Sequence, residues 1–267
     1  MPDWIAVTLL GIIEGITEFL PVSSTGHLLI AEQWLPHRPN LFTLLFNVVI
    51  QCGAVLAVLP LFHDRLHQFF FRLREPAVRD YLLKILVAFA ITGAGGLVLE
   101  KKGFKLPEKL LPVAIALFVG GVLFVIVEAW LRGRKQNDQI TWTIVVAVGI
   151  GQLIAMVFPG ASRSGTTILF MLLLGLNRVA ATEFTFLVGI PTMLAAGGLK
   201  IFKALHHPAA NAPAENWPMV VLGFVVAAIL SFIAVKWLLR YVQTHTFIAF
   251  GWYRIGLAVL IVILLLA

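Results

Sequence analysis

The stretches GIIEGITEFLPVSSTGH at residues 11–27 and GIGQLIAMVFPGASRSGTT at residues 149–167 decide the fold of this chain. Each starts as an apolar run, breaks at a proline and continues with small and hydroxylated residues. An offset of 138 residues places like residues together: Gly11 on Gly149, Glu14 on Gln152, Pro21 on Pro159 and Ser24 on Ser162. The sequence therefore predicts an internal repeat with one interrupted helix in each half.

The composition around these stretches is that of a membrane protein. Of the 267 residues, 60% are hydrophobic, and only 20 basic and 13 acidic residues are charged. A soluble domain of this length would carry roughly a quarter charged residues, on the order of 65. The mean hydropathy of +0.96 excludes a water-soluble enzyme and a disordered chain, because too little polar surface remains to cover a soluble core.

Six apolar runs are long enough to cross about 30 Å of hydrocarbon. They are Leu41–Phe62, Tyr81–Leu99, Leu110–Val127, Phe184–Leu199, Trp217–Val235 and Thr246–Ala267. We expect the Phe184–Leu199 helix to extend beyond the run at both ends. Two shorter runs, Trp4–Leu20 and Ile140–Phe158, lead into the interrupted stretches, and no run alternates at period two as barrel strands do. We predict an all-α polytopic membrane protein in a single domain, with repeat halves at about 1–135 and 139–267.

The loops PVSSTGH and PGASRSG restrict how the interrupted helices lie in lipid. Their backbone groups are tolerated at membrane depth only inside protein or beside a water-filled cavity. We expect both segments to be re-entrant, which leaves three crossings in each half and inverts the second half relative to the first. The simpler alternative, two ordinary spans joined by surface loops, stays open.

The net charge of +7 lies in short connectors, such as residues 65–79 and 101–109, where basic side chains anchor to headgroups. A nucleic-acid partner is therefore not expected. The balance of Lys and Arg places the end of the Leu41–Phe62 run in the cytoplasm and both termini outside. Glu128 and Arg254 lie within about two turns of span ends, so we expect both to snorkel.

Ionisable residues inside apolar runs are the first candidates for function, because each costs about 2.5–3.5 kcal/mol on insertion scales. Glu14 and Glu18 are four residues apart and share a helical face, close enough to ligate one cation or to hold a proton between them. Glu183 starts a later span and is expected near the interface.

The first loop supplies three hydroxyls and an imidazole, in Ser23, Ser24, Thr25 and His27. These are donors and nucleophiles that acyl or phosphoryl transfer uses. One hydroxyl is expected to cap the helix that starts near Gly26. His27 is equally compatible with a backbone hydrogen bond at the helix end.

The second loop resembles an anion-binding nest. Its candidate phosphate contacts are Ser162, Arg163, Ser164, Gly165 and Thr167. Backbone N–H groups and hydroxyls at a helix start favour an anion, and a guanidinium adds forked recognition of phosphate or carboxylate. Arg163 is also a candidate for an ion pair with Glu14 or Glu18.

Four motifs resemble the undecaprenyl-diphosphate phosphatase family, also called the bacitracin-resistance family BacA or UppP. They are EGITEFLPVSSTGHL at 14–28, FNVVIQCGAVLAV at 46–58, PGASRSGTT at 159–167 and ATEFTFLVGIPTM at 181–193. The resemblance implies hydrolysis of undecaprenyl diphosphate to undecaprenyl phosphate and inorganic phosphate, which recycles the cell-wall lipid carrier. It also implies a divalent cation, Mg²⁺ or Ca²⁺, and a site in the bacterial inner membrane that faces the periplasm.

The same resemblance implies roles for single residues. Glu14 and Glu18 match the family's acidic pair, as metal ligands or acid–base groups, and Ser24 and His27 match its first-loop catalytic candidates. Arg163 is implied as a catalytic phosphate contact; the further phosphate contacts we expect are Ser23, Thr25, Ser162, Ser164, Gly165 and Thr167. Asn47 stands where the family commonly has an acidic residue, which leaves the role of that position open.

Several alternatives remain open at the level of the sequence. The nucleophile is Ser24, His27 or water, and a homodimer is one option for the oligomeric state. A secondary transporter or flippase for a lipid phosphate has the same inverted repeat and midplane anion site. A pure carrier needs no nucleophile, however, so the acidic pair and His27 favour the enzyme.

Overall fold

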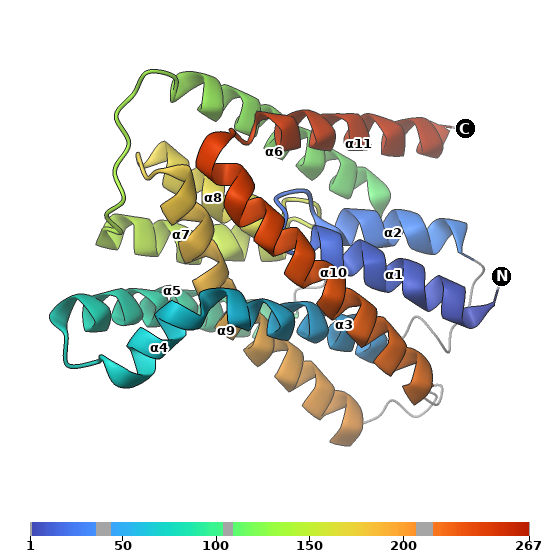
Figure 1. Cartoon of the computed structure of the whole chain (residues 1–267). Helices are drawn as coiled ribbons and strands as arrows, with labels where there is room; N and C mark the ends of the chain where they lie inside the picture. Colours follow the sequence, from blue (N-terminus) through green and yellow to red (C-terminus); the bar gives the residue numbers. More distant parts are fainter. Residues whose placement is uncertain (1, 36–43, 104–108, 207–215, 267) are drawn as a thin grey trace.

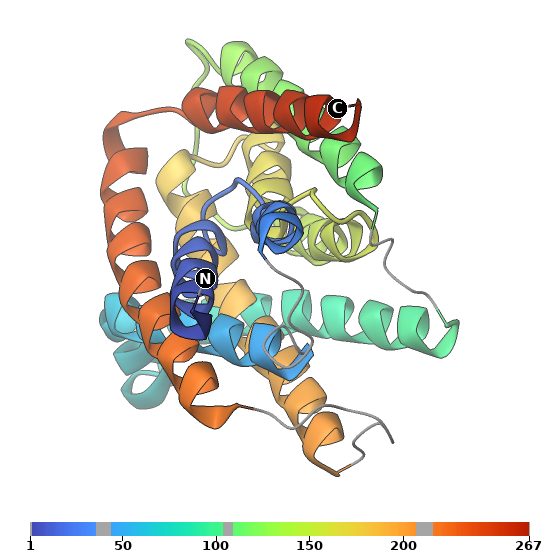
Figure 2. The same ribbon diagram turned by 90° about the vertical axis from the view of Figure 1, so that its right-hand side faces the viewer.

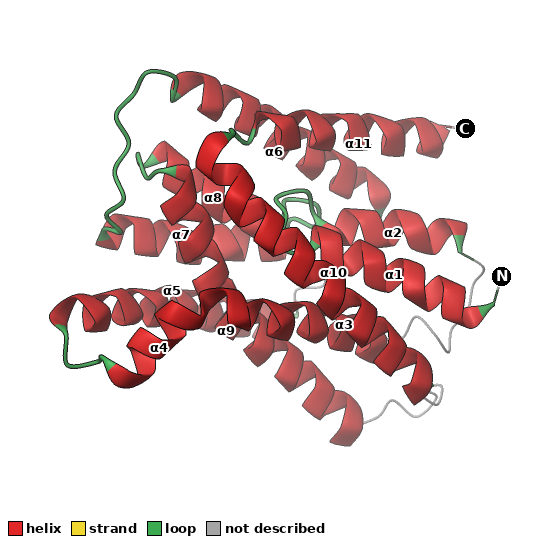
Figure 3. Ribbon diagram, in the orientation of Figure 1, coloured by secondary structure: helices red, strands yellow, loops and turns green. Residues whose placement is uncertain are grey.

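The computed structural model describes residues 2–35, 44–103, 109–206 and 216–266. Within these ranges the secondary structure is helical, with no strand (Figure 3). The all-α fold class is therefore confirmed for the described chain.

Six helical segments of the described chain are long and apolar enough to span a membrane, as the sequence predicts. They are formed by α3 (Leu44–Val58) with η1 (Leu59–Phe62) and α4 (His63–Phe71), α5 (Pro76–Lys101), α6 (Leu110–Trp130), α9 (Arg178–His206), α10 (Trp217–Thr244) and α11 (Ile248–Leu266). Residues 41–43 and 267 of the predicted spans lie outside the described residues. Helix α9 extends beyond its apolar run at both ends, as expected, because the polar residues that flank the apolar centre continue the helix.

The two interrupted segments form helix–loop–helix units. The first consists of α1 (Asp3–Thr17) and α2 (Ser24–Trp34), and the second of α7 (Trp142–Val157) and α8 (Arg163–Leu173). Figure 1 shows α1 and α2 side by side, with their loop beside the α7–α8 loop near the centre of the molecule. The view turned by 90° again places the loops together, below α6 and α11 (Figure 2). The re-entrant path through the membrane and the division into repeats stay predictions.

Helices α2 and α8 both start after a serine with positive φ. Ser23 (φ 74°) accepts a hydrogen bond from the N–H of Gly26, and Ser162 (φ 66°) accepts one from the N–H of Gly165. Each hydroxyl therefore caps its helix, and the left-handed backbone that makes this contact is strained for a residue with a Cβ. By this geometry Ser162 corresponds to Ser23, so the match of Ser24 with Ser162 is wrong by one residue.

Helices α1 and α10 pack closely at Gly15, and substitution of this glycine by alanine is expected to lower the melting temperature. A Cβ on Gly15 would lie 2.5 Å from the carbonyl oxygen of Ala227. Overpacking of this kind typically destabilises by about 1–3 kcal/mol. The control is Gly256→Ala on α11, where a Cβ meets nothing within 4 Å. Thermal unfolding in detergent compares the two, and an equal melting temperature would contradict the close packing.

Two charged residues near span ends are buried, so the snorkelling expected for them is wrong. Glu128 is fully buried and accepts a forked ion pair from Arg178, with a closest distance of 2.5 Å, and a hydrogen bond from the N–H of Phe247. Arg254 is also fully buried and donates to backbone carbonyls. Both side chains find partners on neighbouring helices, which position along their own spans does not indicate.

Candidate active site

A cavity of about 240 Å³ lies between the two loops and the helices α3, α5, α7 and α9. Residues from both interrupted segments line it, so the site is shared between the two predicted halves. The lining residues are Glu18, Ser23, Ser24, Thr25, Gln51, Thr92, Gln152, Ala155, Met156, Gly160, Ser162, Arg163, Thr192, Met193 and Ala196.

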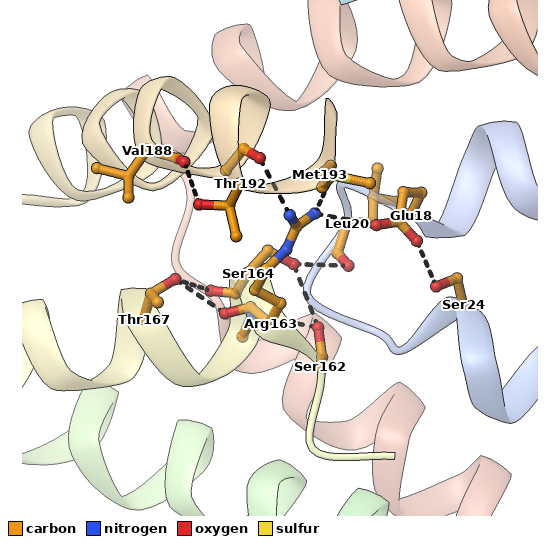
Figure 4. A network of polar contacts seen from close by, with 12 residues as sticks. Glu18, Leu20, Ser24, Ser162, Arg163, Ser164, Thr167, Val188, Thr192 and Met193 are labelled. Carbon is orange, nitrogen blue, oxygen red and sulfur yellow. Dashed lines mark hydrogen bonds and ion pairs between the residues drawn. The ribbon is translucent and has the colours of Figure 1, made fainter. Parts of the chain in front are cut away.

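Arg163 occupies the first turn of α8 and reaches across the cavity (Figure 4). Its Nη2 lies 2.9 Å from Oε1 of Glu18 and also contacts the sulfur of Met193, and its Nη1 donates to the carbonyl of Gly189 at 3.2 Å. The guanidinium is thus held from two sides, by Glu18 and by Gly189 and Met193 of α9. Among the described residues, the N–H on Nε and the second N–H on Nη1 have no partner, so both are available to an anion.

Glu18 and Ser24 form the second contact that matters for chemistry. The Ser24 hydroxyl donates to Oε2 of Glu18 at 2.6 Å (Figure 4). One carboxylate therefore contacts a cation through one oxygen and a hydroxyl through the other. A carboxylate in this position is placed to accept the hydroxyl proton and so to activate the oxygen as a nucleophile.

Glu14 lies beside Glu18 but does not line the cavity. Its side chain is 2% exposed, and its Oε2 has no hydrogen-bond partner among the described residues. Two carboxyl groups in contact within an apolar interior cannot both stay charged without a cation or a shared proton. Glu14 is therefore placed to share a proton or a cation with Glu18.

His27 faces away from the cavity, toward α11. Its Nδ1 lies 2.7 Å from the carbonyl of Ser23, and its Nε2 lies 2.6 Å from the hydroxyl of Tyr253, with the two rings stacked. Donation from Nδ1 to the carbonyl leaves Nε2 as the acceptor for the tyrosine hydroxyl. Both ring nitrogens are thus engaged, and the structure does not bring the imidazole to Glu18 or Arg163.

The remaining second-loop residues are mostly used by the protein itself. Ser164 donates to the carbonyl of Leu20 and so links the two loops, while the N–H of Gly165 is capped by Ser162. The buried hydroxyl of Thr167 contacts the carbonyls of Arg163 and Ser164 and the hydroxyl of Thr185. In the first loop, Ser23 and Thr25 do line the cavity. The structure therefore brings Ser23, Thr25, Ser162 and Arg163 to the cavity, but not Ser164, Gly165 or Thr167.

Outside the loops, the cavity has polar lining residues that sequence reasoning did not assign to the site. Gln152 donates through Nε2 to the hydroxyl of Thr92 at 2.9 Å, and both side chains are buried. Thr192 and Gln51 line the cavity from α9 and α3. The match of Gln152 with Glu14 in the internal repeat is the one signal that points to it.

Glu14 and Glu18 fit a divalent cation in donor type. Carboxylate oxygens are the ligands that Mg²⁺ and Ca²⁺ prefer, and the buried Oε2 of Glu14 lacks another partner among the described residues. In those same residues, no group of three His, Cys, Asp or Glu side chains is placed to hold a metal. Substrate oxygens and water would therefore have to complete the shell, which is usual for Mg²⁺.

Glu183, expected near the interface, pairs with Arg65 at 2.5 Å outside the cavity.

Comparison with known proteins gives one consistent family. The family described as "Bacitracin resistance protein BacA" matches residues 7–260. A protein of Rhizobium etli (strain CIAT 652) named undecaprenyl-diphosphatase is 51% identical over 261 residues, which cover 97% of this chain and 96% of the relative. One of the same name from Xanthomonas euvesicatoria pv. vesicatoria is 48% identical over 264 residues, 98% of this chain and 97% of the relative. The resemblance inferred from the motifs is therefore confirmed, and the chain belongs to the bacitracin-resistance BacA family.

Proposed function

We propose that the protein is an undecaprenyl-diphosphatase, which hydrolyses undecaprenyl diphosphate to undecaprenyl phosphate and inorganic phosphate. The observation that carries this proposal is the contact of Ser24 with Glu18 and of Glu18 with Arg163 in one cavity. A nucleophile, its base and a phosphate-binding cation then lie together among membrane helices. A diphosphate on a lipid is a substrate that such a cavity suits.

Arg163 binds the terminal phosphate through its free N–H groups and stabilises the charge on the equatorial oxygens during transfer. Ser162, Ser23 and Thr25 add hydroxyls around the same anion. The undecaprenyl tail leaves the cavity sideways between helices, since lipid surrounds the protein. Positioning and charge stabilisation thus account for most of the rate enhancement.

Ser24 is the nucleophile that the geometry favours, because its hydroxyl already donates to Glu18. Glu18 takes the proton as the Ser24 oxygen bonds to the terminal phosphorus, and the bond from phosphorus to the bridging oxygen breaks. Undecaprenyl phosphate leaves with that oxygen and accepts the proton from Glu18, which restores the carboxylate. Water, deprotonated by Glu18, then attacks the phosphorus of the phosphoserine, and the bond to the Ser24 oxygen breaks as that oxygen takes the proton back from Glu18 and inorganic phosphate is released. His27, tied to Tyr253 and Ser23, supports the loop rather than attacking.

Glu14 and Glu18 would hold Mg²⁺ or Ca²⁺, which neutralises phosphate charge when bound. Treatment with EDTA is therefore expected to stop phosphate release, and added Mg²⁺ or Ca²⁺ to restore it. Glu14→Gln should raise the cation concentration needed for half-maximal activity, because one charged ligand is lost. Rates of phosphate release across a cation titration measure both effects, and release that EDTA leaves untouched would refute the metal site.

The direct test of the activity is phosphate release from undecaprenyl diphosphate by the purified protein in detergent. Release by the wild type supports the phosphatase. A well-folded wild type that binds the lipid but releases no phosphate would instead support the transporter or flippase, for which the shared cavity is the favouring observation.

The bacterial relatives support a location in the inner membrane, and the distribution of Lys and Arg supports a cavity that faces the periplasm. The partners we propose are the lipid substrate and the membrane, with no nucleic acid. A homodimer would bury apolar helix faces that otherwise contact lipid, and the oligomeric state in detergent tests it.

A further inference from the structure

Arg254 on α11 is a buried cation that the mechanism above does not use. It is the largest fully buried side chain of the described residues, and no ion pair within that part of the chain includes it. A buried guanidinium without a carboxylate needs other acceptors to offset its desolvation. Those acceptors are five backbone carbonyls at 2.9–3.4 Å: Ala116 and Leu117 of α6, Pro21 of the first loop, and Gly160 and Ala161 of the second loop.

Glycines on two other helices leave room for this guanidinium. A Cβ on Gly165 of α8 would lie 2.7 Å from Nη1 of Arg254, and a Cβ on Gly120 of α6 would lie closer still to Nη2. Any side chain at either position would displace the guanidinium. The space for Arg254 is therefore built by residues far from it in the sequence.

The carbonyls that Arg254 binds flank the catalytic side chains. Pro21 lies between Glu18 and Ser24, and the second-loop carbonyls directly precede Ser162 and Arg163. The guanidinium is planar and rigid, so its N–H groups fix these carbonyls relative to one another. The distance from Ser24 and Glu18 to Arg163 thus depends on a residue outside the cavity.

We propose that Arg254 is a positioning residue that holds the two loops in register for phosphoryl transfer, an inference that rests on the phosphatase activity proposed above. It does not line the cavity, so its effect on substrate passes through the loops. A misplacement of about 1 Å in a catalytic group lowers rates by about a hundredfold. Loss of the hydrogen bonds from Arg254 to the two loops therefore lowers kcat, while phosphate still binds Arg163 and KM stays near the wild-type value.

The experiment compares two variants that disturb the hydrogen bonds from Arg254 to the loops with two controls that do not. Arg254→Lys keeps the charge but loses the fork, and Gly120→Ala keeps the arginine but displaces its guanidinium. Arg178→Lys breaks the forked ion pair of the half-buried Arg178 with the buried Glu128 outside the cavity, and Gly256→Ala adds a methyl group on α11 in open space. For each variant kcat, KM, product inhibition by inorganic phosphate and the melting temperature are measured in detergent.

We expect Arg254→Lys and Gly120→Ala to lower kcat about a hundredfold, with KM and phosphate inhibition near wild type. Arg178→Lys should lower the melting temperature but keep kcat, and Gly256→Ala should change neither. Wild-type kcat in both Gly120→Ala and Arg254→Lys would overturn the positioning role. So would a loss of kcat in Arg178→Lys that is in proportion to its lower melting temperature, because kcat would then report stability alone. If Arg254→Lys does not fold, Gly120→Ala decides alone. A wild type without phosphate release would instead overturn the phosphatase itself.

Discussion

Arg163→Ala is expected to lower kcat/KM for phosphate release by about 10³- to 10⁵-fold, the contribution of a catalytic arginine to phosphoryl transfer. The guanidinium is the cation that lines the cavity and has N–H groups to spare for phosphate. Alanine also leaves the buried Glu18 without its partner, which disturbs the base. Initial rates with undecaprenyl diphosphate in detergent measure the loss.

A lysine variant of Arg163 separates the effect of its positive charge from that of the forked guanidinium, and a lysine variant of Arg65 is the control. Arg163→Lys keeps a positive charge without the fork, so its activity should lie between those of alanine and wild type. Arg65→Lys is the control, because Arg65 pairs with Glu183 outside the cavity and should keep wild-type rates. Wild-type activity in Arg163→Ala would remove the phosphate-binding role.

Ser24→Ala and Glu18→Gln are each expected to lower kcat by about 10²- to 10⁴-fold. The hydroxyl and the carboxylate handle the same proton, so the double variant should be no slower than the slower single variant. Steady-state rates of the four proteins, corrected for the folded fraction, give this comparison.

Ser231→Ala controls for the loss of a buried hydroxyl, since Ser231 is fully buried on α10 and does not line the cavity. Losses that multiply in the double variant would mean that the two groups act independently. Wild-type kcat in Ser24→Ala would exclude the serine and assign the attack to water.

The fold could be predicted because lipid imposes strong constraints on sequence. Six apolar runs, two proline-broken stretches and few charges predict an all-α membrane protein, and the six spans have the expected order. The ends of helices were less predictable. Polar residues continue α9 beyond its apolar centre, and the sequence predicts that extension but not the residues at which the helix begins and ends.

The site was partly predictable, for a similar reason. Glu18, Ser24 and Arg163 stand out because charges and hydroxyls next to a break in an apolar helix need an explanation. Thr92 and Gln152 do not, since single polar residues in apolar spans commonly bond between helices. Arg254 was missed because its acceptors are backbone carbonyls, which no sequence pattern marks.

The ion pair of Glu18 with Arg163 has a consequence for the timing of the reaction. In the resting protein each group is the counter-ion of the other, so neither charge is unbalanced in the apolar interior. An arriving phosphate brings a second anion to the same guanidinium, which binds it through the N–H groups that Glu18 and Gly189 leave free. The same guanidinium therefore serves Glu18 between turnovers and the phosphate during them.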